Sequence, residues 1–321
     1  MRAIVQDRYG DADVLRQDQI AIPRITGNEV LVRVHAAGVD RGTWHLMTGT
    51  PYLLRLAFGL RGPKNPVLGR DVAGVVEAVG PAVTAFKAGD EVYGVAPGSF
   101  AEYAVAREDK LARKPANLSF EQAAVVPISA LTALDALTIG RIKAGQHVLI
   151  TGASGGVGSY AVQLAKAFGA EVTGVASTQK LDLVRSLGAD HVIDYTQQDF
   201  AATGNRYDLI IDIAGNPTLS RLRRALTATG TAVITGGEDG GGLTGGMNRQ
   251  LRGLILSLFV RQRITMFVNK ESGSDLVRLT ELIEAGKVTP SVDRTYPLDQ
   301  AADALRHLAE GKVRGKVAIA I

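Results

Sequence analysis

A run of small residues, Ala153 to Gly158, directly follows the apolar segment His147 to Thr151. Its residues Ala153, Gly155 and Gly158 fill the three positions of the fingerprint with which a strand-to-helix turn binds the pyrophosphate of a dinucleotide. Such a turn needs residues without bulk, because the pyrophosphate must approach backbone N–H groups at the N-terminus of a helix. An ordinary strand-to-helix turn would explain the glycines alone. The βα alternation around the run favours the dinucleotide site.

The end of the next apolar segment bears on which dinucleotide binds. In NAD-specific sites, an acidic residue about 20 positions after the turn holds the ribose hydroxyls. Here the segment ends with Ser177, Thr178 and Lys180, so no carboxylate is expected at this corner of the site. The hydroxyls can donate hydrogen bonds, and the lysine can form a charge-assisted contact with a 2′-phosphate. The sequence therefore predicts NADPH over NADH, with helix capping and a solvated lysine as the alternative interpretation.

Positioning these residues requires a parallel sheet, and the middle of the chain has its pattern. From about residue 121, short apolar segments alternate with helix-like ones, which is typical of βαβ units. The expected strands are 147–151, 171–175, 191–193, 209–212 and 232–235, and the expected helices are 160–168, 180–187 and 219–228. The glycine-rich stretch 236–246 is expected to be a loop, either a plain linker or an active-site lid.

The two ends of the chain have a different pattern. Up to about residue 122, short alternating strands such as 29–35 and 71–79 indicate an antiparallel β region, with no helical stripe of convincing length. Helices at 275–285 and 298–309 and a strand at 316–321 do not continue the alternation, so we expect them to return to the first domain. The fold class is therefore α/β, with a β-rich domain and a doubly wound parallel sheet.

Composition excludes several classes of protein. The chain has 321 residues, enough for two domains, and no cysteine, which excludes disulfides, thiolate nucleophiles and thiolate metal ligands. Its start does not resemble a signal peptide, and the longest apolar run, 253–260, is too short to span a bilayer, so we expect a cytoplasmic protein. The net charge of +4 would attract an anionic cofactor.

Further motifs carry a family resemblance. The segment Gly69-Arg70-Asp71-Val72-Ala73-Gly74-Val75-Val76-Glu77-Ala78-Val79-Gly80, the segment 86–92 and the ending Arg314-Gly315-Lys316-Val317 resemble the medium-chain dehydrogenase/reductases, in their quinone oxidoreductase-like, zinc-free branch. The resemblance implies a GroES-like catalytic domain, residues 1–122 and 271–321, and a Rossmann NADPH-binding domain, residues 123–270. It also implies a cleft between the domains, with the nicotinamide at its floor.

The resemblance also implies roles for individual residues. It assigns the pyrophosphate to Ser154, Gly155, Gly156 and Val157 beside Ala153 and Gly158, and the 2′-phosphate end to Ser177, Lys180 and Tyr195, with Thr178 adjoining. Near the nicotinamide it suggests Thr132 and the residues Ala214, Gly215, Phe267 and Asn269, and we expect Gly236 among the cofactor-binding residues too. Arg314 is expected to close over the cofactor. Helix packing for Thr132 and core burial for Phe267 are the alternatives.

No metal is expected. Zinc-dependent relatives have a cysteine ligand in the segment matching 39–43 and a His-Glu pair where this chain has Arg70 and Asp71, so the tetrahedral ligand set cannot be assembled. Without a Lewis acid, the easier chemistry is hydride delivery to an electron-poor carbon of a quinone or an α,β-unsaturated carbonyl. The five histidines show no ligand spacing.

The catalytic candidates are Asp40, His45, Tyr52 and Thr132. Relatives usually have Asn at the position of Asp40, and an acid beside the nicotinamide carboxamide could alter substrate choice. The oxyanion left by hydride transfer needs a proton, which His45 could donate near neutral pH, with Tyr52 next and solvent as the competitor.

The predicted function is NADPH-dependent, zinc-independent reduction of a small-molecule quinone or enone. Relatives suggest a homodimer joined along an edge strand near 264–267. The alternatives are a carbonyl or alcohol dehydrogenase, or an NADPH-binding sensor or RNA-binding protein without turnover. An RNA surface would use Arg221, Arg223, Arg224, Arg249 and Arg252, but without interleaved aromatics we expect these to form a solvated face.

Overall fold

The computed structural model describes residues 1–236, 242 and 244–321. The chain forms two compact units, one of residues 1–131 and 270–321 and the other of residues 132–269. The first boundary lies later than the expected residue 122, inside helix α4 (Pro127–Ile139). Helix α3 (Phe120–Ala124) falls in the first unit because it packs on strands β3, β4 and β15 there.

The first unit is built on a mostly antiparallel sheet with strand order β14-β15-β3-β4-β5-β7, in which β6 also pairs with β3. Its strands are β3 (Glu29–Val39), β4 (Asp71–Val79), β5 (Glu91–Val95), β6 (Tyr103–Arg107), β7 (Leu111–Arg113), β14 (Val292–Pro297) and β15 (Lys316–Ala320), and β1 (Arg2–Val5) pairs with β2 (Arg16–Gln19). The C-terminal strand β15 pairs antiparallel with β3, so the end of the chain completes the sheet begun near its start.

Helices α1 (Arg41–Thr48) and α2 (Arg55–Phe58) interrupt the N-terminal part of the first unit, where the sequence shows no convincing helical stripe. Helices α9 (Gly273–Glu284) and α10 (Ala301–Ala309) lie in the first unit, as expected for 275–285 and 298–309. Helix α1 is short but has both end signals: the Asp40 side chain accepts a hydrogen bond from Thr43 N, and Gly49 ends the helix in the left-handed region at φ 63°. Its length is too small to produce a clear apolar stripe.

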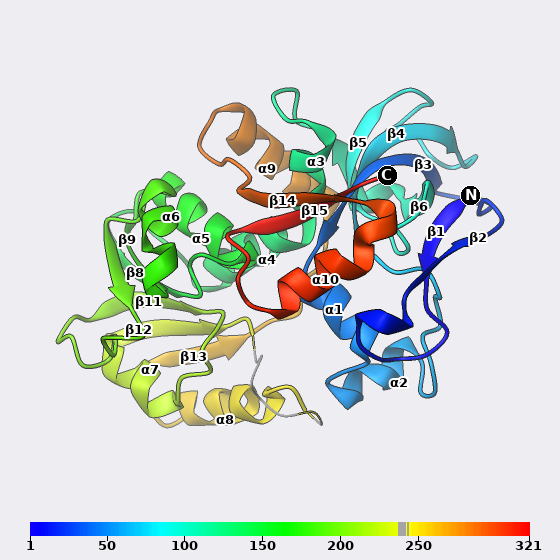
Figure 1. Ribbon diagram of the computed structural model, residues 1–321. Coiled ribbons are helices and arrows are strands. Elements are labelled where there is room, and N and C mark those ends of the chain that lie inside the picture. Colours follow the sequence, from blue (N-terminus) through cyan, green and yellow to red (C-terminus); the bar gives the residue numbers. More distant parts are fainter. Residues whose placement is uncertain (237–241, 243) are drawn as a thin grey trace. The chain divides into compact units, whose positions relative to one another are not determined.

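The second unit is a parallel sheet with strand order β10-β9-β8-β11-β12-β13. The strands are β8 (His147–Thr151), β9 (Glu171–Ala176), β10 (His191–Asp194), β11 (Tyr207–Asp212), β12 (Leu226–Ile234) and β13 (Arg263–Met266). Figure 1 shows α5 (Gly156–Ala167) and α6 (Leu181–Ser186) on one face and α7 (Leu219–Ala225) and α8 (Met247–Ser257) on the other. The strand order reverses between β8 and β11, which is where open α/β sheets bind ligands.

Burial explains why these segments become strands. Val148, Leu149 and Ile150 in β8 are fully buried, as are Leu209, Ile210 and Ile211 in β11. A strand covered on both faces is apolar throughout, and burial of each such side chain contributes about 1.5 to 3 kcal/mol. One helix was predicted too long: 219–228 runs into β12, whose first residue, Leu226, is buried in the core beside the β-branched Thr227.

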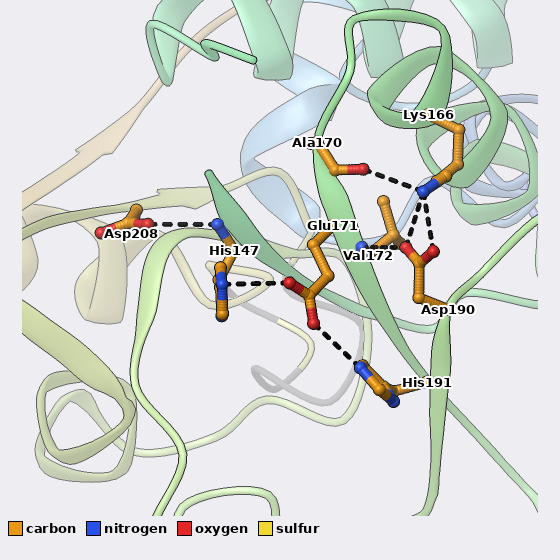
Figure 2. Close-up of polar contacts among 8 residues, drawn as sticks. All are labelled: His147, Lys166, Ala170, Glu171, Val172, Asp190, His191 and Asp208. Carbon is orange, nitrogen blue, oxygen red and sulfur yellow. Dashed lines mark hydrogen bonds and ion pairs between the residues drawn. The ribbon is translucent and has the colours of Figure 1, made fainter. Parts of the chain in front are cut away.

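Polar contacts fix the amino ends of β8, β9 and β10 (Figure 2). Glu171 pairs with His147 at 3.0 Å and accepts from His191 at 2.9 Å, so both exposed histidines contribute to local structure. Lys166 of α5 donates to both carboxylate oxygens of Asp190, at 2.8 and 2.7 Å, and to Ala170 O. Burial alone would raise the pKa of Asp190, but the hydrogen bonds from Lys166 and Val172 N outweigh it, so the pKa lies below its ordinary value.

We expect Asp190→Asn to lower the free energy of unfolding by roughly 0.5 to 1 kcal/mol at pH 7, since the pair is partly exposed and screened by solvent. Because the folded-state pKa is depressed, this contribution exists above the unfolded-state pKa of about 3.9 and is lost as pH falls through the folded-state value. Urea unfolding of Asp190→Asn, Lys166→Met and the double variant, at pH 7 and pH 3, measures the coupling. A coupling of equal size at both pH values would contradict this account.

Candidate functional site

The turn after β8 has the geometry of a pyrophosphate site. Gly152 has φ +66°, in the left-handed region, and Ala153 N donates to Val175 O of β9 at 3.0 Å. Gly155 is the N-cap of α5 and provides no side-chain hydrogen bond to the first turn of the helix. The first N–H groups of α5 therefore lack the partner that a serine or aspartate cap would supply, which leaves this end suited to an anion.

Close packing explains the last glycine of the turn. A Cβ on Gly158 would lie 2.1 Å from Gly152 O and 2.7 Å from Ala153 Cα. Only a residue without a side chain lets α5 begin this close to the strand, as the fingerprint requires. Ser154 is buried, while Gly155, Gly156 and Val157 are partly exposed. These residues fit a dinucleotide pyrophosphate.

The residues predicted for the 2′-phosphate end lie together at the carboxyl ends of β9 and β10. Ser177 precedes the single 3₁₀ turn Thr178–Lys180, and Tyr195 N donates to Ala176 O at 3.2 Å. Tyr195 is 63% exposed, so its ring is available to a ligand.

The prediction that no carboxylate lies at this corner is wrong. Asp194, the last residue of β10, is the register partner of Ala176 and accepts hydrogen bonds from the hydroxyls of Thr178 and Thr196. The bonds from Thr178 and Thr196 hold the pKa of Asp194 below its ordinary value. The second strand of this unit, β9, ends without an acid, whereas Asp194 comes from the third strand, β10. While Thr178 donates to Asp194, its hydroxyl proton is not available to a phosphate.

The ends of β8 and β11 meet at the switch point, where Thr151 and Asp212 are register partners. Thr151 donates to Asp212 Oδ1 at 3.1 Å and accepts from Ile213 N and Ala214 N at 2.9 and 3.3 Å. The predicted residues Ala214 and Gly215 thus follow a backbone segment held by a buried side-chain network. Thr151, Asp212 and Arg249 were not among the predicted site residues, although polar residues ending two apolar strands were a visible signal.

Two of the residues predicted near the nicotinamide are joined directly. Asn269 Nδ2 donates to Thr132 Oγ1 at 2.8 Å, which links the residues that begin and end the second unit. Phe267 lies two residues before Asn269 and is half-buried, and Gly236 follows β12. The question whether 236–246 is a lid or a linker falls mainly on residues 237–241 and 243, which lie outside the described part of the chain.

The first unit contains the other predicted residues, Asp40, His45, Tyr52 and Arg314. Asp40 Oδ1 accepts from Thr43 N at 2.6 Å, and its buried Oδ2 has no hydrogen-bond partner among the described residues. His45 Nδ1 lies 2.6 Å from Thr50 O, so Nδ1 carries the proton and the neutral ring donates nothing further. Tyr52 is about half exposed and lies under the Arg55 guanidinium, and Arg314 is half-buried.

Arg70 and Asp71, at the positions where zinc-dependent relatives have a His-Glu pair, both form ion pairs. Arg70 pairs with Glu271, and the fully buried Asp71 lies 3.4 Å from Lys316 Nζ and accepts from Ile128 N at 2.9 Å. Burial raises the pKa of Asp71 to about 7, and Lys316 opposes that rise. Within the described ranges, no three residues of the types His, Asp and Glu gather in a way that could hold a metal ion.

Of the arginines considered for RNA binding, Arg224 and Arg252 are exposed, but Arg249 does not belong to a solvated face. Arg249 is mostly buried and pairs with Asp212 at 2.6 Å, so the prediction is wrong for this residue. Arg221 pairs with Asp199, and Arg223 donates to Gln262. Throughout residues 1–236, 242 and 244–321, the helices are too short or too polar for any of them to cross a bilayer.

Comparisons with known proteins agree with this geometry. Residues 26–116 match the family model described as alcohol dehydrogenase GroES-like domain, and residues 187–319 match the one described as zinc-binding dehydrogenase. The NADPH-dependent alkenal/one oxidoreductase of Arabidopsis thaliana is 36% identical over 99% of this chain and 79% of its own length. The mitochondrial NAD(P)H oxidoreductase RTN4IP1 of Bos taurus is also 36% identical, over 99% of this chain and 89% of its own.

Among solved structures, the Escherichia coli quinone oxidoreductase complexed with NADPH superposes with a TM-score of 0.85 at 27% identity, with all of both chains covered. The expected α/β class, a GroES-like domain with a Rossmann sheet, is confirmed. The relatives are NAD(P)H-dependent oxidoreductases by name, and the turn after β8 fits such a cofactor. On this sequence similarity and this fold, the chain belongs to the medium-chain dehydrogenase/reductases and, within them, to the quinone oxidoreductase-like members.

Proposed function

We propose that this protein reduces quinones or α,β-unsaturated carbonyls with NADPH and without zinc. Two ion pairs, Arg70–Glu271 and Asp71–Lys316, best support this proposal. They lie where zinc-dependent relatives have their His-Glu pair. Two cations occupy a place where zinc would need neutral imidazole or thiolate, and the chain has no cysteine. Substrates that need no Lewis acid therefore suit the site best.

The bound nicotinamide would supply hydride to an electron-poor carbon of the acceptor. The protein's own part is to hold the cofactor, through the turn 153–158 and the residues Ser177, Lys180 and Tyr195, and to provide a proton. His45 remains the proposed donor. Since its Nδ1 proton is engaged by Thr50 O, the ring can donate to the acceptor only from Nε2, while that nitrogen also carries a proton.

Label transfer tests the proposed reaction. With NADPH deuterated at C4 and an enone as acceptor, we expect deuterium at the β-carbon of the product, measured by NMR or mass spectrometry. Deuterium at the carbonyl carbon would instead make the protein a carbonyl reductase. NADPH that binds without acceptor-dependent oxidation across a panel of quinones and enones would favour the sensor hypothesis.

We expect activity to survive exhaustive chelation, because the donor set at Arg70 and Asp71 does not suit zinc. The measurement is turnover before and after treatment with a strong chelator, together with the metal content of the purified protein. Stoichiometric zinc, with activity that is lost on its removal and restored on its return, would refute zinc independence while leaving the hydride chemistry in place.

The homodimer remains a proposal. Strand β13 ends the parallel sheet, and Leu258, Phe259 and Val268 near it are about 80% exposed. An edge strand that no other described strand pairs with, beside exposed apolar side chains, suits pairing with a second copy.

A further inference from the structure

A buried ion pair lies at the switch point of the parallel sheet. The Asp212 carboxylate, which ends β11, is 1% exposed and lies 2.6 Å from a guanidinium nitrogen of Arg249 on α8. Its other oxygen accepts from the Thr151 hydroxyl at the end of β8. Burial raises the pKa of Asp212, and the charge of Arg249 opposes this rise.

The network reaches three separate backbone segments at the carboxyl edge. Thr151 Oγ1 accepts from Ile213 N and Ala214 N. Arg249 donates to Pro217 O at 2.9 Å, beyond that segment, and to Gly236 O at 3.2 Å, after β12. The backbone carbonyl of Asp212 also accepts from Thr235 N and Thr235 Oγ1. The ends of β8, β11 and β12 are therefore tied through one carboxyl group and one guanidinium.

Stability alone is a weak reason for such a pair, because well-packed apolar residues of similar volume often stabilise a core as well or better. Charged groups instead fix the orientation of hydrogen bonds. The guanidinium donates in one plane and so determines where its carbonyl partners lie. The carbonyls and amides fixed here border Ala214 and Gly215, the residues expected beside the nicotinamide.

We infer that Asp212, Arg249 and Thr151 form a positioning network that sets the backbone at residues 213–215 for the nicotinamide half of the cofactor. The inference rests on the proposed function only in taking NAD(P)H as the ligand. The adenosine half, bound at the ends of β9 and β10, should not depend on this network.

The experiment compares the two halves of the cofactor. Arg249→Lys keeps the charge but not the planar donor set, and Thr151→Val removes the acceptor for Ile213 N and Ala214 N, with Thr151→Ser as its conservative match. Arg221→Lys is the control, because Arg221 also pairs with an aspartate of the same unit but on the surface. For each variant, calorimetry measures the affinity for 2′,5′-ADP and for NADPH, and the emission of bound NADPH reports the nicotinamide environment.

We expect Arg249→Lys and Thr151→Val to keep 2′,5′-ADP affinity within about twofold, to weaken NADPH binding about tenfold and to shift its emission. Thr151→Ser and Arg221→Lys should match the parent protein. Equal losses for both ligands, or none for either, would overturn the inference, and Thr151→Val decides it if Arg249→Lys does not fold. A parent protein that binds NADPH but reduces no acceptor refutes the proposed function alone. A parent that binds neither ligand refutes both.

Discussion

Replacing Gly158 by alanine should abolish measurable NADPH binding and lower the thermal midpoint of the protein. The added Cβ would lie 2.1 Å from Gly152 O and 2.7 Å from Ala153 Cα, and both are backbone atoms that cannot rotate away. Overpacking of this kind costs about 1 to 3 kcal/mol, which exceeds the gain of about 1 kcal/mol from alanine in a helix. To remove this clash, α5 would have to move away from the turn. That movement would displace the N–H groups that are expected to bind the pyrophosphate.

Gly155→Ala is the matched control for this prediction. Gly155 has φ −86° and ψ −177°, which alanine adopts easily, and its Cβ would meet only Gly152 O, at 3.4 Å. The fold should therefore be unchanged, while a methyl group at the N-cap hinders approach of the pyrophosphate and weakens NADPH binding by about tenfold or more. Thermal denaturation and NADPH titration of both variants separate the two effects. Full NADPH affinity in Gly155→Ala would contradict a pyrophosphate at this turn.

The parallel sheet and its first turn could be predicted from the sequence because their signals are local. A strand buried on both faces is a continuous apolar run, so 147–151 was predicted with the bounds that β8 has in the structure. The requirement for glycine in the turn that follows arises from contacts within the turn itself, so it too can be predicted from the local sequence. Strand β4 of the first unit, Asp71–Val79, was likewise predicted with the bounds that it has in the structure.

The rest of the site depends on contacts that no local pattern contains. Asp194 reaches Thr178 only because β10 pairs with β9, and Arg249 reaches Asp212 across 37 residues of sequence because α8 packs beside that end of the sheet. Strand order and helix placement are set by packing of the whole unit, so a single sequence gives each of these residues several equally plausible partners. The sequence alone does not distinguish a buried arginine, such as Arg249, from an exposed one.

The unpredicted position of Asp194 bears most directly on the predicted preference for NADPH. Ser177 and Lys180 still favour a 2′-phosphate at the end of β9, but Asp194 places a negative charge beside them and engages the Thr178 hydroxyl. If the 2′-phosphate binds here, removal of that charge should strengthen its binding, because two negative charges at short range repel each other. Asp194→Asn should therefore tighten NADPH binding about fivefold and leave NADH nearly unchanged.

An acid introduced at the end of β9 should act in the opposite direction. Ser177→Asp places a carboxylate where NAD-specific sites hold the ribose hydroxyls, so it should weaken NADPH binding by about tenfold or more and improve NADH binding. Because the 2′-phosphate carries close to two negative charges at pH 7, both effects should shrink as salt is raised from about 0.05 to 0.5 M. Titration of both cofactors against the parent protein and the two variants measures the preference directly. If the parent binds NADH as tightly as NADPH, and Asp194→Asn weakens NADH, then Asp194 holds the ribose hydroxyls and the protein is an NADH enzyme.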